Sequence, residues 1–97
     1  MGVIIYTENR QGVKTTQEHT ESLSKGNLIE VLREAGLRHE NKSLPLEAAR
    51  FALDDQVRWI KQRPTNEYDE WMADVMTKLS ALCVKGLNAG DTHISWS

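Results

Sequence analysis

The side chains that could act in metal binding or nucleophilic catalysis are scattered along the chain. His19, His39 and His93 lie in three different segments, and no two of them have the i, i+4 spacing that places ligands on one helix face. Cys83 lies in an apolar stretch, where a thiol usually packs as a small hydrophobic group with a raised pKa. These residues therefore predict neither a metal site nor a catalytic cysteine.

The acidic pair and the glycines likewise predict no catalytic or nucleotide-binding site. Asp54 and Asp55 are adjacent, so on a helix they point about 100° apart and cannot serve one substrate group as paired acid and base. Gly12 and Gly26 are isolated, and no Gly-rich phosphate loop follows the first predicted strand. We therefore expect no cofactor and no enzymatic activity.

Aromatic and basic side chains are concentrated around Pro64. In QVRWIKQRPTNEYDEWM, residues 56–72, Trp59 and Trp71 stand on either side of this proline. Tryptophan, tyrosine and arginine are enriched at the energetic centre of protein interfaces, because they bring a large contact area at a low entropy cost. The candidate partner-binding residues are Phe51, Arg58, Trp59, Arg63, Tyr68 and Trp71.

Phe51 and Trp59 belong to a second apolar face of one predicted helix. On a wheel of 100° per residue they project away from the stripe of Leu53, Val57 and Ile60. Two interpretations follow. Either the helix is central and a β-sheet covers its second face, or Phe51 and Trp59 form an exposed patch that receives a partner. For Tyr68 and Trp71 the competing interpretation is packing at the corner between two helices.

The charge distribution argues against a nucleic-acid partner. The chain has 12 basic and 14 acidic residues and a formal net charge of −2, without the basic stripe that a phosphate backbone requires. Glu67, Asp69, Glu70 and Asp74 adjoin the aromatic residues and would repel phosphates. The expected partner is therefore another protein.

Length and hydropathy indicate a single globular domain over residues 1–97. A chain of this length buries roughly 60–65% of its unfolded surface, which is enough for one core. No apolar run approaches the roughly 20 residues needed to cross a bilayer, and MGVIIYTENRQG lacks the basic flank and long apolar core of a secretory signal. We expect a cytoplasmic protein without a membrane partner.

Capping residues predict a first helix over about 25–35. Asn27 can cap it with Glu30 at the third helical position, and Gly36 can adopt the left-handed conformation that closes it, with Leu37 folding back. The preceding segment, QEHTESLSKGN, is polar and predicts a loop.

Two longer helices are predicted over about 44–62 and 66–88. Ser43 can cap the second helix, and Pro64 disfavours helical geometry at the residue before it, so that helix ends there. Thr65 or Asn66 can cap the third. Each helix has an apolar stripe and the connection is short, so the pair is expected to form an antiparallel hairpin.

The termini predict β-structure. VIIYT and VKTT flank the polar ENRQG and indicate a hairpin, and THISWS alternates in a way that favours a last strand against it. The expected fold is α+β, with the helical hairpin and the first helix packed on a small antiparallel sheet. An all-helical bundle with frayed ends is the competing architecture.

These patterns lead to three functional hypotheses. The first is a small protein-binding module, such as an inhibitor, immunity-type or accessory protein, that docks its aromatic helical face on a larger protein. The alternative is a homodimer whose interface forms the functional or ligand-binding unit. A small DNA-binding helical domain comes third, because the eight-residue GLRHENKS is longer than the turn of a helix-turn-helix.

Overall fold

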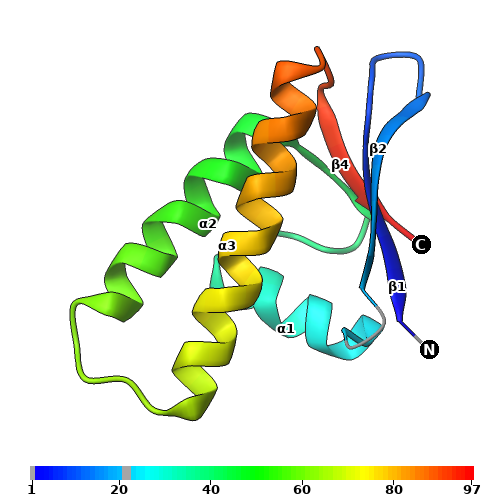
Figure 1. Cartoon of the computed structure of the whole chain (residues 1–97). Coiled ribbons are helices and arrows are strands. Elements are labelled where there is room, and N and C mark those ends of the chain that lie inside the picture. The colour runs from blue at the N-terminus through cyan, green and yellow to red at the C-terminus, as the bar shows by residue number, and fades with distance from the viewer. Residues whose placement is uncertain (1, 21–22) are drawn as a thin grey trace.

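Three helices pack on one face of a four-stranded antiparallel sheet, which confirms the predicted α+β class (Figure 1). The computed structural model describes residues 2–20 and 23–97, and of residues 18–20 only the backbone. In chain order the elements are β1 (Val3–Glu8), β2 (Lys14–Thr20), α1 (Lys25–Glu34), β3 (Ser43–Pro45), α2 (Leu46–Lys61), α3 (Glu67–Asn88) and β4 (His93–Trp96).

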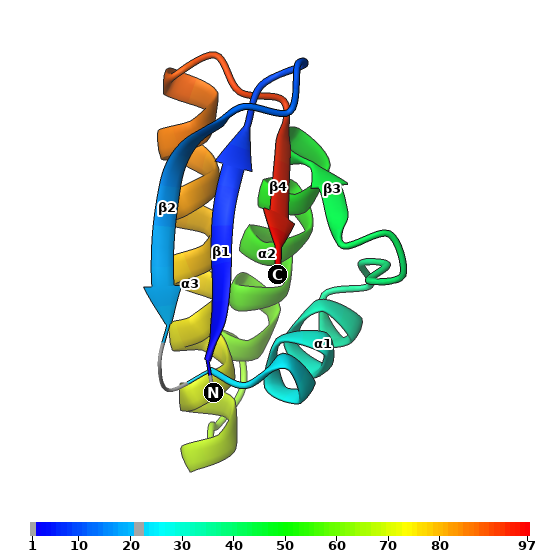
Figure 2. The ribbon, with the colours of Figure 1, turned by 90° about the vertical axis from the view of Figure 1, so that its right-hand side faces the viewer.

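The sheet places the two ends of the chain side by side at its centre. Its strand order is β2-β1-β4-β3, and β1 pairs antiparallel with both β2 and β4 (Figure 2). The predicted hairpin and the predicted C-terminal strand are thus both confirmed. In the hairpin the register shifts after Thr7, which pairs with Thr16, because Thr15 is an extra residue on the β2 side.

The helices cover one side of the sheet and leave the other open (Figure 2). Along β1 the buried residues are Val3, Ile5 and Thr7, which alternate with half-buried neighbours, as expected for a strand with one covered face. Ile94 and Trp96 of β4 pair with Thr7 and Ile5, so they share the covered side. The core therefore lies between this face and the three helices.

Helices α2 and α3 form the predicted antiparallel hairpin (Figure 1). The hairpin buries Leu53 and Ile60 of α2 against Met76 and Leu79 of α3 within the same hydrophobic cluster. Asn66, one of the two predicted caps, caps α3: its side chain accepts a hydrogen bond from the backbone N–H of Asp69 at 2.8 Å. The helix boundaries at this corner thus agree with those predicted from Pro64 and Asn66.

Helix α1 ends as predicted but is capped by a different residue. Gly36 has φ = 74°, and the N–H of Leu37 donates to the carbonyl of Leu32 at 2.8 Å, which is the predicted left-handed closure. The N-terminal cap is Ser24, whose hydroxyl accepts from the N–H of Asn27. The prediction of Asn27 as the cap was wrong, because the helix already begins at Lys25.

Two short β-segments differ from the sequence-based expectation. Ser43 does not cap α2 but lies in strand β3, where its hydroxyl oxygen is 3.1 Å from that of Ser95, and α2 begins only at Leu46. Strand β2 extends to Thr20, into the segment predicted to be a loop. Strand β3 and the end of β2 lie at sheet edges, where polar residues and proline are common, so these two segments do not look like strands in the sequence.

Candidate functional site

Phe51 and Trp59 are exposed on α2, with 71% and 55% of their surface accessible. The interpretation in which the sheet covers them is therefore wrong. Strands β3 and β4 contact α2, and its buried side chains there are Leu46, Ala49 and Leu53. Helix α2 consequently presents a buried stripe to the core and a second stripe, which contains both aromatic rings, to solvent.

We call this second stripe the α2 face. Its residues are one turn apart along the helix, and all are exposed except the half-buried Ala52. They are Ala48, Phe51, Ala52, Asp55, Arg58, Trp59 and Gln62. Helix α2 itself lies at the margin of the molecule in Figure 1.

Ion pairs lie on and beside the α2 face, and one of their arginines stacks on Trp59. Arg58 forms an ion pair with Asp55 at 3.3 Å, between Phe51 and Trp59. The guanidinium of Arg63 stacks over the ring of Trp59 at 4.4 Å and also reaches Asp69 of α3 at 3.5 Å. The predicted residues Phe51, Arg58, Trp59 and Arg63 thus share one surface.

Tyr68 and Trp71 form a separate contact. Their ring centroids are 5.9 Å apart, and the hydroxyl of Tyr68 donates to Glu30 of α1 at 2.7 Å. This hydrogen bond, followed by desolvation and nearby negative charges, raises the pKa of Tyr68 to about 12. Trp71 is half-buried and packs against the core. Tyr68 therefore ties α3 to α1, whereas the corner-packing interpretation placed this residue between the second and third helices.

A groove of about 340 Å³ borders the α2 face. It is lined by Glu47, Arg50, Phe51, Asp54, Arg58 and Leu87, so it lies between α2 and the last turn of α3. Beneath it Asp54 accepts a hydrogen bond from Ser80 at 2.5 Å and faces Arg50 at 3.7 Å. Arg50 and Asp54 are thus paired within the chain, and Phe51 and Leu87 are the hydrophobic residues of the groove.

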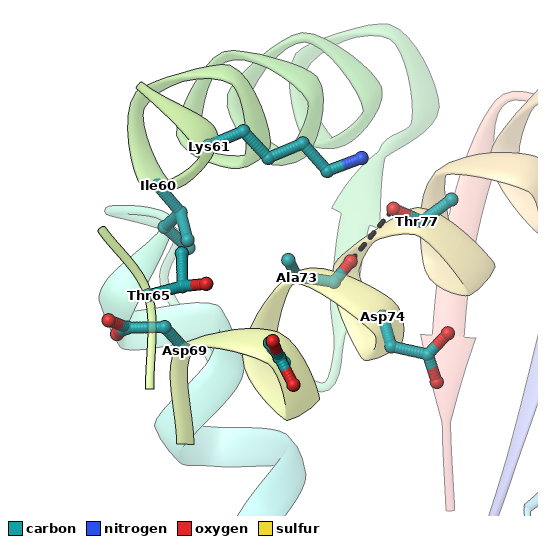
Figure 3. A pocket seen from close by; sticks show the side chains of 8 residues that line it. Ile60, Lys61, Thr65, Asp69, Ala73, Asp74 and Thr77 are labelled. Carbon is teal, nitrogen blue, oxygen red and sulfur yellow. Dashed lines mark hydrogen bonds between the residues drawn. The ribbon is translucent and has the colours of Figure 1, made fainter. Parts of the chain in front are cut away.

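A second groove, of about 350 Å³, lies at the other end of the helical hairpin (Figure 3). Lys61 extends from α2 across it, and three carboxylates from α3 border it. The lining residues are Ile60, Lys61, Thr65, Asp69, Glu70, Ala73, Asp74 and Thr77. Acidic and open, this groove suits neither phosphate nor a buried apolar ligand.

The uncovered side of the sheet is polar. Lys14 stacks on the ring of Tyr6 at 4.2 Å, and the hydroxyl of Ser95 donates to Glu8 at 2.8 Å. These contacts satisfy the side chains locally. Among the described residues, the large hydrophobic side chains exposed to solvent are Val13, Phe51, Trp59 and Tyr68, so the α2 face is where two of them share an element.

The candidate metal ligands do not come together. His93 lies on β4, with Nδ1 2.8 Å from the hydroxyl of Thr92, and His39 lies in the loop after α1. The side chain of His19 lies outside the described residues. In the described part of the chain, no three His, Cys, Asp or Glu side chains are placed to hold a metal ion.

Cys83 is buried in the core. Desolvation, followed by the charge of Asp54, raises the pKa of its thiol to about 12. A thiol in this state is not a nucleophile at neutral pH.

A buried polar cluster around Asp91 was not anticipated from the sequence. Asp91 is 5% exposed, and its Oδ2 accepts hydrogen bonds from Thr7, at 2.7 Å, and from Thr15. Thr16 completes the cluster through its contact with the hydroxyl of Thr7. Asp91 is separated from these threonines by most of the chain. The one local sequence feature that points to this position is Gly90 before it, which closes α3 and has φ = 83°.

Helices α1 and α2 are joined through a strand. The connection from Glu34 to Leu46 contains β3, whereas a helix-turn-helix needs a tight turn. No helix in the described residues has the length and apolar character needed to cross a bilayer.

Comparison with protein-family models, with curated proteins and with solved structures finds no significant match to this chain. Its function is therefore inferred from its own surfaces.

Proposed function

We propose that this protein is a small binding module that docks its α2 face on a larger protein and acts by binding rather than by catalysis. The observation that carries the proposal is the exposure of Phe51 and Trp59 on one side of one helix, at 71% and 55%. An exposed phenyl ring and an exposed indole two turns apart give an anchor for a hydrophobic pocket at each end of the surface.

The surroundings of the two rings support a protein partner. Arg58 and Arg63 are already paired with Asp55 and Asp69, so a partner that covers them does not bury an isolated charge. The groove of about 340 Å³ beside Phe51 offers room for one partner side chain, with Leu87 on its wall. An inhibitor, immunity-type or accessory protein would have such a surface.

Capture of a partner by the tagged full-length chain from the native host tests the proposal. We expect one protein to bind the wild-type chain and to be lost with Phe51→Ala/Trp59→Ala. Each truncation at an interface anchor should weaken binding by about 2 kcal/mol, or about 30-fold. The affinities are then measured with the purified partner by calorimetry.

Val13→Ala is the matched control, because Val13 is 55% exposed on the β1–β2 turn, away from the α2 face. Circular dichroism checks that all variants fold. The proposal fails if the double variant is folded and binds the same partner as tightly as the wild-type chain does.

A further inference from the structure

The α2 face is complementary to itself. Asp55 lies at its centre, with Phe51 four positions before it and Trp59 four positions after it. Two such helices packed antiparallel about a two-fold axis through Asp55 place Phe51 of each copy opposite Trp59 of the other.

The remaining residues of the face also match in size under this symmetry. Arg58 falls opposite Ala52 of the second copy, and Gln62 falls opposite Ala48. Each long side chain therefore meets a small one, which lets the two helices approach each other without steric overlap.

The charges are compatible with the same arrangement. Arg58 pairs with Asp55 of its own chain at 3.3 Å, one turn away along the helix. Around the two-fold axis the two Asp55 carboxylates are then flanked by two guanidinium groups. The central acidic pair is thus neutralised in place.

We infer that a second copy of this chain covers the α2 face when no larger partner does, in an antiparallel dimer centred on Asp55. The inference uses the same surface as the proposed function, so the dimer and the complex with a larger protein exclude each other. Self-association then keeps the two aromatic rings out of water until a partner competes for them.

The size of the surface predicts a weak dimer. Four aromatic side chains, each of which covers about 150–250 Å² when fully buried, supply at most about 600–1,000 Å², which is below the roughly 1,200 Å² at which stable specific interfaces begin. We expect a dissociation constant in the micromolar range, which allows a dedicated partner to displace the second copy.

Sedimentation equilibrium of the full chain between about 1 µM and 1 mM tests for the dimer. We expect the average mass to rise from monomer to dimer over this range. Phe51→Ala/Trp59→Ala should remain monomeric throughout, whereas Val13→Ala should associate like the wild-type chain. A wild-type chain that stays monomeric throughout overturns the inference, as does a double variant that still dimerises.

Cysteine cross-linking tests the register. Asp55→Cys places two thiols at the two-fold axis, so mild oxidation should give a covalent dimer. Gln62→Cys alone should not, because its two copies lie about 21 Å apart along the helices, at about 1.5 Å per residue, beyond the reach of a disulfide. A mixture of Gln62→Cys and Ala48→Cys should cross-link.

The native Cys83 does not interfere, because it is buried and its thiol has a raised pKa. Efficient cross-linking of Gln62→Cys by itself, or none of Asp55→Cys, contradicts the antiparallel register.

The result of the dimer test can be told apart from that of the proposed function. A monomer that still captures a larger partner through Phe51 and Trp59 refutes the dimer alone, and a dimer that captures none refutes only the docking role.

Discussion

Asp91 joins the two ends of the chain through one buried carboxylate. Its backbone N–H closes α3 by donating to Gly86 at 2.8 Å, while its Oδ2 accepts from Thr7 and Thr15 of the hairpin. Its Oδ1 is buried without a hydrogen-bond partner among the described residues. A buried carboxylate oxygen without a hydrogen-bond partner costs free energy, so the two hydrogen bonds at Oδ2 must hold the side chain in place.

Asp91→Asn should lower the free energy of unfolding by about 1–3 kcal/mol, because the amide loses the charge-assisted bonds and buries an N–H₂ group. Urea denaturation measures this change. The matched control is Asp74→Asn, which removes an exposed ion pair with Lys78 at 3.1 Å and should cost at most about 1 kcal/mol. Equal effects of the two substitutions would mean that the buried cluster contributes nothing specific.

Gly86 lets α3 approach β1 closely. A Cβ at this position would lie 2.7 Å from Cγ2 of Thr7, inside van der Waals contact. Gly86→Ala should therefore destabilise the protein by about 1–3 kcal/mol, although alanine is the better helix former. Gly26→Ala in α1 is the control, since its Cβ would meet only Ser24 Oγ at 3.9 Å, and it should be neutral or stabilising. Thermal denaturation of both variants shows whether alanine raises or lowers the stability at each site.

Cys83 gives the stability a dependence on alkaline pH. Its thiol pKa is raised from 9.0 to about 12, so the unfolded chain loses this proton at a lower pH than the folded chain does. The thiol's contribution is complete below pH 9 and is lost between pH 9 and about 12, by up to about 1.4 kcal/mol per pH unit.

The difference in unfolding free energy between the wild-type chain and Cys83→Ala, measured by urea denaturation across this pH range, isolates the thiol. Tyr68 has a raised pKa as well, but it is present in both proteins and cancels. A difference that stays constant from pH 9 upward would contradict the assignment.

At the scale of the elements, helix boundaries follow from local residues and could be predicted. The left-handed Gly36, the cap Asn66 and the break before Pro64 each act within one turn of the chain, so the sequence alone indicates them. Strand β3 was missed because its local residues do not determine its conformation. Ser43 and Pro45 read as a helix start, and only the distant β4 makes them a strand.

The candidate site, too, could be predicted only as far as local residues determine it. The helical wheel places Phe51 and Trp59 on a second face of α2, but whether the sheet covers that face depends on which side of the helix packs inward. Tyr68 and Trp71 looked like part of the same surface, yet Tyr68 bonds to Glu30 of α1 instead. The Asp91 cluster could not be predicted, because its partners come from the opposite end of the chain.

Asn66→Ala tests the start of α3. The substitution removes the acceptor for the N–H of Asp69 and should cost about 1 kcal/mol of stability. Asn66→Ser keeps an acceptor at the same position and should retain most of the stability that the cap contributes. Chemical denaturation measures both variants. If alanine and serine were equally harmful, the side-chain cap would not be the cause.

At the scale of the whole molecule, the last strand completes both the sheet and the core. In the described sheet β3 pairs with β4 alone, and β4 brings Ile94 and Trp96 into the hydrophobic cluster. We expect a chain truncated before Thr92 to lose cooperative thermal unfolding. A peptide of residues 92–97, added in excess, should restore part of the transition. A truncated chain that unfolds as sharply as the full one would show that the helices and hairpin are sufficient.

The central pairing of β1 with β4 also constrains how the protein is made. At about 5–20 residues per second, β1 leaves the ribosome several seconds before β4 is synthesised, and one of its edges has no strand beside it during that time. An open strand edge is a template for foreign chains. Neighbouring nascent chains on one messenger RNA are therefore exposed to mispairing. Chaperones should raise the yield of native protein, and slower translation should lower it.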